Sequence, residues 1–256
     1  MSTVLISLLV VAGICILLAL GYINHIVETS RLEKARLKAD LSDRLRRCEL
    51  LCESLPGQMM SPALKALLYR LQLHYCQKLL PLDKNNAELR QRSNLLQAEV
   101  AKGEAVGVAN LPQKITTEAI AKDVRFQLEG LDAQIVHAAQ KRLLDAAEAR
   151  RWDAEIRHMM VLMNIELFTS LGQAALQQNH PGQARLAFER GVQYLRKIPG
   201  NNRYQQALQL LEAQLERANA LVLQTSDLSQ DSSNELNEGL KQLDGEELWK
   251  KNPIYD

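Results

Sequence analysis

The sequence predicts an all-α protein with one transmembrane helix near its N-terminus. Three observations predict this class. The 20 residues from Val4 to Ile23 carry no charged side chain, leucine and alanine recur at three- and four-residue intervals through most of the rest, and no stretch alternates apolar with polar residues as a strand would. With 46% hydrophobic residues and a net charge of +1, the composition excludes wholesale disorder and disfavours a basic nucleic-acid binder.

The run from Val4 to Ile23 is long enough to cross a bilayer, because a helix rises about 1.5 Å per residue and the hydrocarbon core is about 30 Å thick. Residues 1–3 would form a short extracytoplasmic end. A cleaved signal peptide is the alternative: residues 19–21 (ALG) resemble a small-x-small cleavage site, but no basic residue precedes the apolar run. We expect an uncleaved single-pass anchor.

Basic residues follow the apolar run and none precedes it, which sets the expected orientation. Because lysine and arginine resist translocation, the N-terminus should lie outside and the C-terminal domain in the cytoplasm, as in a bacterial inner (plasma) membrane protein. The basic stretch from Arg31 to Arg47 could also contact anionic lipid headgroups. The simpler interpretation is a solvated helix face. The basic residues are Arg31, Lys34, Arg36, Lys38, Arg44, Arg46 and Arg47.

Residues 24–55 predict a basic helical stalk that continues the membrane helix, since no glycine or proline interrupts it before Pro56. The apolar residues from Leu41 to Leu55 are spaced by 4, 3, 4 and 3, which is typical of a short coiled coil. They are Leu41, Leu45, Cys48, Cys52 and Leu55. This seam could make a homo-oligomer or could pack against helices of its own chain.

Cys48, Cys52, His74 and Cys76 are candidate zinc ligands by residue type. Their spacing matches no compact zinc module, however, and small buried thiols also act as apolar residues in a helical seam. We therefore expect neither a metal nor a cofactor, although the sequence leaves the question open.

Residues 61–224 predict a single domain of helical hairpins. Ser61 with Pro62 should start one helix, residues 81–86 form a turn, a second helix covers 87–102, and 103–116 form a loop. Thr116 or Thr117 should cap a helix that runs to about residue 149, and residues 150–153 are the expected corner. The apolar stretch 156–168 should be the most buried, and a last helix is expected over 202–224.

Residues 165–198 resemble one tetratricopeptide repeat (TPR), a 34-residue unit of two helices. The matching positions are Phe168, Leu171, Gly172, Ala184, Phe188 and Gly191, with residues 179–182 (NHPG) as the turn between helices. Gly172 would let the two helices approach closely. Ala175 departs from the pattern, because the family usually has a large aromatic residue there, and neighbouring frames match poorly.

The resemblance implies a concave surface that binds a protein partner, lined by the first helix of the repeat. The matching positions here are Glu166, Thr169, Gln173 and Gln177. The lysine and asparagine clamp with which some members hold an acidic C-terminus is missing, so such a partner is not expected. The alternative is a helical packing unit without a ligand groove.

The amino-acid composition changes after residue 224. Residues 225–244 are polar and acidic and predict a disordered linker, whereas 245–256 carry Trp249, Ile254 and Tyr255. Large apolar groups after such a linker are typical of a short recognition motif. It would bind either a partner or a groove on its own chain.

We find no catalytic pattern in the sequence. No two of the five histidines are three or four residues apart, and no metalloprotease, nucleophile-elbow or phosphate-loop motif occurs. The sequence therefore predicts a non-enzymatic, membrane-anchored adaptor or scaffold that binds proteins through the helical domain and the C-terminal motif. The alternative is a self-associating coiled-coil subunit of a bacterial envelope assembly, such as division, secretion or pilus machinery.

Overall fold

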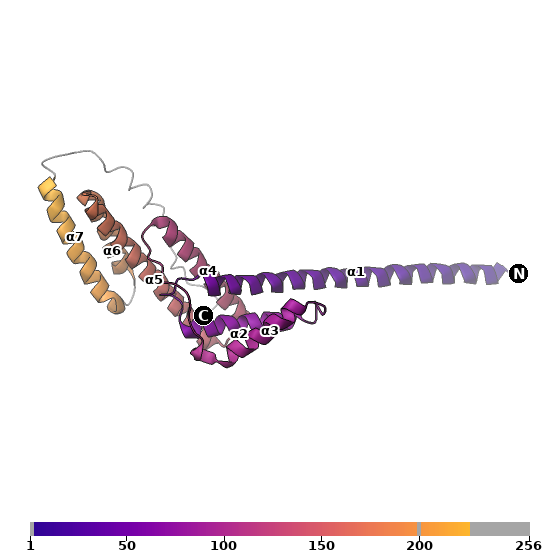
Figure 1. The fold of residues 1–256 in the computed structure, drawn as a ribbon. Coiled ribbons are helices and arrows are strands. Elements are labelled where there is room, and N and C mark those ends of the chain that lie inside the picture. Colours follow the sequence, from indigo (N-terminus) through magenta and orange to yellow (C-terminus); the bar gives the residue numbers. More distant parts are fainter. Residues whose placement is uncertain (1–2, 199–200, 226–256) are drawn as a thin grey trace. The chain divides into compact units, whose positions relative to one another are not determined.

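The computed structural model describes residues 3–198 and 201–225, of which the side chains of 3–21, 23, 24, 201 and 225 are left out. Every regular element in this part of the chain is helical (Figure 1), which confirms the predicted all-α class. The elements are α1 (Thr3–Ser54), α2 (Pro62–Leu79), α3 (Ala87–Ala101), η1 (Gly103–Ala105), α4 (Glu118–Gln140), α5 (Ala146–Gln177), α6 (Pro181–Lys197), η2 (Asn201–Tyr204) and α7 (Gln205–Thr225).

The helices form two compact units, where the sequence predicted one helical domain over 61–224. Unit 1 comprises the described residues of Met1–Cys52 together with Pro62–Gly107. Unit 2 comprises Glu53–Ser61 and the described residues from Val108 onward. The predicted stalk therefore does not stand apart from the helical domain, because its last turns belong to the cores of these units.

Unit 1 is built on the seam that the sequence predicted in the stalk. Leu45, Cys48 and Cys52 are buried, and the Gln72 amide on α2 donates to the Cys52 Sγ at 3.2 Å and to the Cys48 carbonyl at 3.4 Å. Ion pairs join α1 to the neighbouring segments, from Lys38 to Asp83 at 2.8 Å and from Glu49 to Arg92 at 2.7 Å. Of the two expected uses of the seam, the structure has packing within the chain.

Several predicted helix starts are confirmed. α2 begins at Pro62, and α4 begins at Glu118 with Thr117 as its cap, whose hydroxyl accepts from the Ile120 N–H at 3.3 Å. Proline at the first helical position costs no hydrogen bond, and a capping hydroxyl satisfies one of the free N–H groups.

The predicted corner at 150–153 is wrong. These residues lie inside α5, where Trp152 is buried, and the chain turns instead between Gln140 and Ala146. Arg142 takes a left-handed conformation (φ 56°), and the Asp145 carboxylate caps α5 by accepting from the Glu148 N–H at 2.6 Å. The turn contains neither glycine nor proline, so its sequence carries no strong break signal.

Arg142→Gly is expected to stabilise unit 2 by about 1 kcal/mol, because a side chain in the left-handed region costs about 1–2 kcal/mol that glycine avoids. Asn179→Gly is the matched control. Asn179 has a similar φ of 58°, but asparagine tolerates that conformation, so its gain should be smaller. Urea unfolding of both variants measures the difference. An unchanged or lowered stability for Arg142→Gly would show that the turn is not strained.

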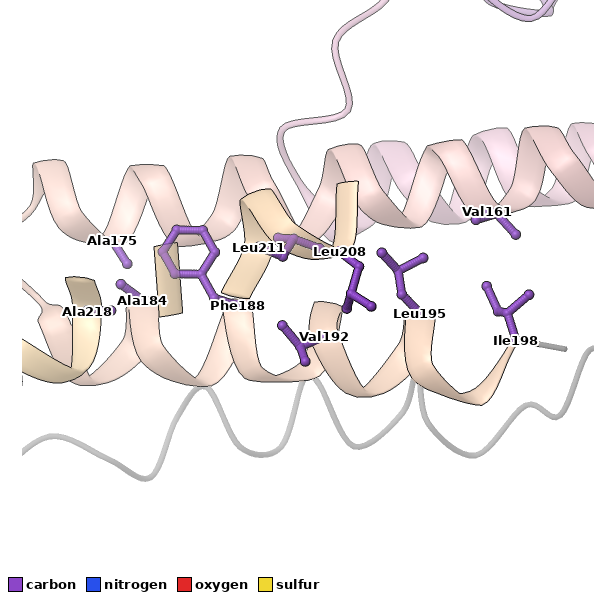
Figure 2. Packing of buried hydrophobic residues seen from close by; sticks show 10 residues of the cluster. All are labelled: Val161, Ala175, Ala184, Phe188, Val192, Leu195, Ile198, Leu208, Leu211 and Ala218. Carbon is purple, nitrogen blue, oxygen red and sulfur yellow. The ribbon is translucent and has the colours of Figure 1, made fainter. Parts of the chain in front are cut away.

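The core of unit 2 lies among α5, α6 and α7. Figure 2 shows side chains of α6, including Phe188 and Leu195, pointing toward α5. Leu208 and Leu211 of α7 belong to the same buried cluster. The predicted buried stretch 156–168 is confirmed at Ile156, Met159, Met163, Leu167 and Phe168, whereas Leu162 is 44% exposed.

One helix with described side chains, α5, is long and apolar enough to cross a membrane by length and composition alone. The core helix of a soluble protein passes the same test, and 44% of the most apolar 18-residue stretch of α5 is buried within the protein. Residues 4–23 lie within α1, but their side chains, apart from that of Tyr22, are outside the described part of the structure.

Candidate functional site

The α5–α6 hairpin carries the positions that resemble a TPR. A Cβ at Gly172 would overlap with the Phe188 ring and lie only 2.8 Å from its Cδ1 atom, so the predicted close approach of the two helices at this glycine is confirmed. Ala184 and Phe188 are fully buried.

The turn between α5 and α6 closes as a Schellman motif. The His180 N–H donates to the Ala175 carbonyl at 2.9 Å, and the Asn179 N–H donates to the Leu176 carbonyl at 3.1 Å. Asn179 takes the left-handed position that this motif requires.

The hairpin departs from a regular repeat in the length of its first helix. α5 has 32 residues and begins at Ala146, whereas a 34-residue repeat has to hold two helices. The frame at 165–198 therefore starts in the middle of a continuous helix. The local packing agrees with the resemblance, while membership of the repeat family stays a prediction.

The four α5 residues expected to line a groove differ in how far they are exposed to solvent. The Glu166 carboxylate accepts a hydrogen bond from the buried Ile115 N–H at 2.9 Å, so it holds a segment of its own chain. Thr169 is half-buried, and Gln173 and Gln177 are exposed. The most exposed part of the predicted row is therefore the last two turns of α5, and the role of all four residues in binding a partner stays a prediction.

The segment that reaches Glu166 also forms a structure that the sequence did not predict. We name the pairing of residues 53–58 with 110–113 the clasp. The Gly57 N–H donates to the Leu111 carbonyl at 2.9 Å, and the Asn110 amide donates to the Leu55 carbonyl at 2.8 Å. Gln58 and Gln113 exchange two hydrogen bonds, of 2.6 and 3.0 Å. The clasp thus ties the loop after α1 into unit 2.

A groove of about 370 Å³ lies between α6 and α7. Its lining is mostly polar, and Val192 and Leu215 are the two apolar residues in it. Arg196 in this lining pairs with Glu212 at 2.6 Å, whereas Arg185 is exposed and forms no ion pair with any residue that the structure describes. The full lining is Arg185, Glu189, Val192, Gln193, Arg196, Leu215 and Asn219.

A ring pair joins η2, just before α7, to α5. His158 stacks on Tyr204, with a hydrogen bond of 2.8 Å between Nδ1 and the phenol oxygen. Burial, followed by the charge of Arg203, lowers the pKa of His158. The neutral imidazole is therefore the form that this packing favours, which suits a structural contact.

The four candidate zinc ligands do not form a site. Within the residues whose placement is described, no group of three or more histidine, cysteine or acidic residues could hold a metal ion. Burial, followed by the nearby Cys52, raises the pKa of Cys48 to about 12, and burial also raises the pKa of Cys76. A buried thiol that keeps its proton is a poor metal ligand, because the thiolate is the ligating form.

The three thiols Cys48, Cys52 and Cys76 are expected to resist alkylation in the folded protein. At pH 8, iodoacetamide should modify them at least about tenfold more slowly than in urea, because all three thiols are buried and burial raises the pKa of Cys48 and Cys76. Mass spectrometry of peptides after timed alkylation measures this. Equal rates in the folded and unfolded chains would contradict the burial of these thiols.

The other candidate residues lie beyond the described chain. The described residues end at 225. They therefore leave out the rest of the linker 225–244 and the motif 245–256 with Trp249, Ile254 and Tyr255.

Comparison with known proteins found no match: no family model fits the chain, and no curated protein or solved structure is significantly similar to it. The functional argument therefore depends on the chain itself.

Proposed function

We propose that the protein is a membrane-anchored, non-catalytic adaptor whose helical surface and C-terminal motif bind protein partners. The continuity of α1 carries this proposal. The uncharged residues 4–23 and the buried residues Leu45, Cys48 and Cys52 belong to one unbroken helix, Thr3–Ser54. A rigid helix of this kind couples an apolar anchor directly to a folded unit.

The basic face of α1 supports a cytoplasmic position for both units. Arg31, Lys34 and Arg36 are exposed and follow the apolar run, which favours an outside N-terminus in a bacterial inner membrane. Arg44 and Arg47 instead pair with acidic residues one helical turn away, Asp40 and Asp43, at 3.1 and 2.7 Å. Contact with anionic lipid would therefore fall mainly to the residues nearest the membrane.

Two surfaces are available for partners in the proposed adaptor. One is the end of α5 with Gln173 and Gln177, and the other is the C-terminal motif with Trp249 and Tyr255. Confinement to a membrane raises the effective concentration for a second contact, so two weak contacts can act together.

The coiled-coil subunit is not favoured as a function. Leu45, Cys48 and Cys52, which it would use for self-association, are buried within the chain's own unit. A surface that is already covered has little apolar area left to gain by oligomerising.

Crosslinked co-purification from membranes tests the adaptor function. We would compare the full chain with a chain lacking residues 245–256 and with the Gln173→Glu/Gln177→Arg variant. Gln140→Arg, an exposed glutamine at the end of α4, is the matched control. Partners should be lost from one or both test chains and kept by the control. An unchanged or empty partner set in every chain would contradict the proposal.

A further inference from the structure

The outer face of α4 carries a large aromatic side chain that the rest of unit 2 leaves uncovered. Phe126 is 76% exposed, and it is the only exposed phenylalanine, tyrosine or tryptophan among the described residues of unit 2. Ala119 and Ala133, seven residues to either side, are exposed as well. Seven residues make almost two full turns of a helix, so the three side chains form one row along α4. The row is narrow and apolar, with its largest member at the centre.

Two opposite charges lie along one edge of this row. Lys122 and Glu129 are exposed and form no ion pair with any residue that the structure describes. They are also seven residues apart, so they stand on the same side of the row. Phe126 lies at the midpoint between them. A two-fold axis through Phe126 therefore brings Lys122 of one copy to the level of Glu129 of a second copy, and the reverse.

We propose that a second copy of this chain packs on α4 through this row, with the two α4 helices antiparallel. The two Phe126 rings then contact each other at the two-fold axis, in the offset geometry that aromatic pairs prefer. Ala119 of each copy lies opposite Ala133 of the other, and these small side chains let the helices approach closely. Lys122 pairs with Glu129 of the second copy, twice in each dimer.

Self-complementarity is the argument for a second copy rather than another partner. In a two-fold interface one patch has to supply both members of every contact. The row on α4 does so, because ring meets ring, alanine meets alanine and lysine meets glutamate. No other chain has to provide a matching surface.

The direction of the pair follows from the helix dipoles. A parallel pair would bring Lys122 beside Asp123 of the second copy and leave Glu129 without a cation, whereas the antiparallel pair leaves Asp123 without one. Charge pairing alone therefore does not choose between them. Neighbouring helix dipoles attract when they are opposed, and this favours the antiparallel pair.

The size of the row makes the pair reversible. A single helix face is smaller than a standard stable interface, which buries about 800 Å² of each partner. Pairing through α4 uses neither the seam from Leu41 to Leu55 nor the residues Gln173 and Gln177. A dimer would thus present the expected partner surface twice, which strengthens weak contacts. The inference goes beyond the proposed adaptor function and holds whether or not the chain is anchored in a membrane.

Cysteine crosslinking in intact cells tests the pair and its direction. Two differently tagged full chains, one with Ala119→Cys and the other with Ala133→Cys, are co-expressed and treated with the membrane-permeant oxidant diamide. Dimers with one chain of each kind should exceed dimers of two like chains at least about tenfold, because only the mixed pair brings the new thiols within disulfide distance. The unaltered chain, which keeps the native cysteines, sets the background. A dimer yield no higher than this background, or an excess of dimers of like chains, would overturn the proposal.

The aromatic centre is tested in the same assay. Phe126→Asp in both chains should lower the yield of mixed dimers at least about tenfold, because it places two like charges at the two-fold axis. Leu210→Asp is the matched control, since Leu210 is a similarly exposed apolar residue (67%) on α7, and it should leave the yield unchanged. Equal losses in the two variants, or no loss with Phe126→Asp, would contradict a contact at Phe126.

Charge exchange tests the register independently. Lys122→Glu in both chains should lower the yield about threefold to fivefold, in line with partly exposed ion pairs. Adding Glu129→Lys should restore it, because the exchanged charges attract equally in an antiparallel pair. In a parallel pair the second substitution could not restore the yield, since the new glutamate would still face Asp123. Failure of the double exchange to restore the yield would overturn the antiparallel assignment.

Discussion

Gly172→Ala is expected to destabilise unit 2 by about 2–3 kcal/mol. The new methyl group would overlap with the ring of Phe188, which is fully buried. Overpacking of a filled core typically costs about 1–3 kcal/mol, and the effect belongs at the upper end because a rigid ring has to move. The hairpin that carries Gln173 and Gln177 would be displaced with it.

Urea unfolding monitored by circular dichroism measures the effect of Gly172→Ala. Gly130→Ala is the matched control, because Gly130 lies inside α4 with open space around its Cα, and alanine there should stabilise the helix by up to about 1 kcal/mol. Phe188→Leu introduced with Gly172→Ala should recover part of the loss, since the smaller side chain makes room. A Gly172→Ala variant as stable as the unaltered chain would contradict the close packing of α5 on α6.

Gly57→Ala is expected to break the clasp and destabilise unit 2 by about 3 kcal/mol. A Cβ at this position would overlap with the Asn110 carbonyl oxygen and lie 3.0 Å from its carbon and 3.1 Å from the Leu111 carbonyl carbon. These are backbone atoms that cannot rotate away. The Gly57 N–H to Leu111 bond would be lost along with the close approach.

The readout for Gly57→Ala is local as well as global. Hydrogen exchange at the Ile115 amide, which donates to Glu166, should speed up together with that of Gly57. Gly107→Ala is the control, because a Cβ at Gly107 meets no atom within 4 Å. If Gly57→Ala left both the exchange at Ile115 and the stability unchanged, the clasp would not be part of the folded unit.

The elements that local chemistry specifies could be predicted from the sequence. Pro62 and Thr117 start their helices as expected, because proline and capping hydroxyls act within one turn. The close approach at Gly172 was expected from the resemblance to a TPR, in which a glycine at this position lets the two helices pack closely. The alternation of leucine spacing identified the α class throughout.

The elements that depend on distant contacts could not be predicted. The corner at Arg142 has no glycine or proline, although Arg142 takes a left-handed conformation there. The clasp joins Gly57 to Leu111, residues far apart in sequence whose pairing leaves no periodic pattern. The hydrogen bond from the Ile115 N–H to Glu166 likewise joins residues far apart in sequence and could not be predicted.

The candidate binding surface was predictable only in part. The polar row of α5 was expected from the resemblance to a TPR, whereas the groove at Arg185 and Leu215 requires knowledge of how α6 and α7 meet. The seam at Cys48 was identified, but its role could not be decided, because an apolar helix face packs equally well on another copy or on its own chain.

The direct test of a membrane-anchored cytoplasmic adaptor is the topology of the full chain in intact spheroplasts. We would label Ser2→Cys and Gln224→Cys separately with a membrane-impermeant maleimide. Gln224 is exposed on α7, and the native Cys48, Cys52 and Cys76 are buried. The account predicts that Ser2→Cys is labelled in intact cells and that Gln224→Cys is labelled only after the membrane is permeabilised. Labelling of Gln224→Cys from outside, or release of the chain from membranes by alkaline carbonate, would contradict it.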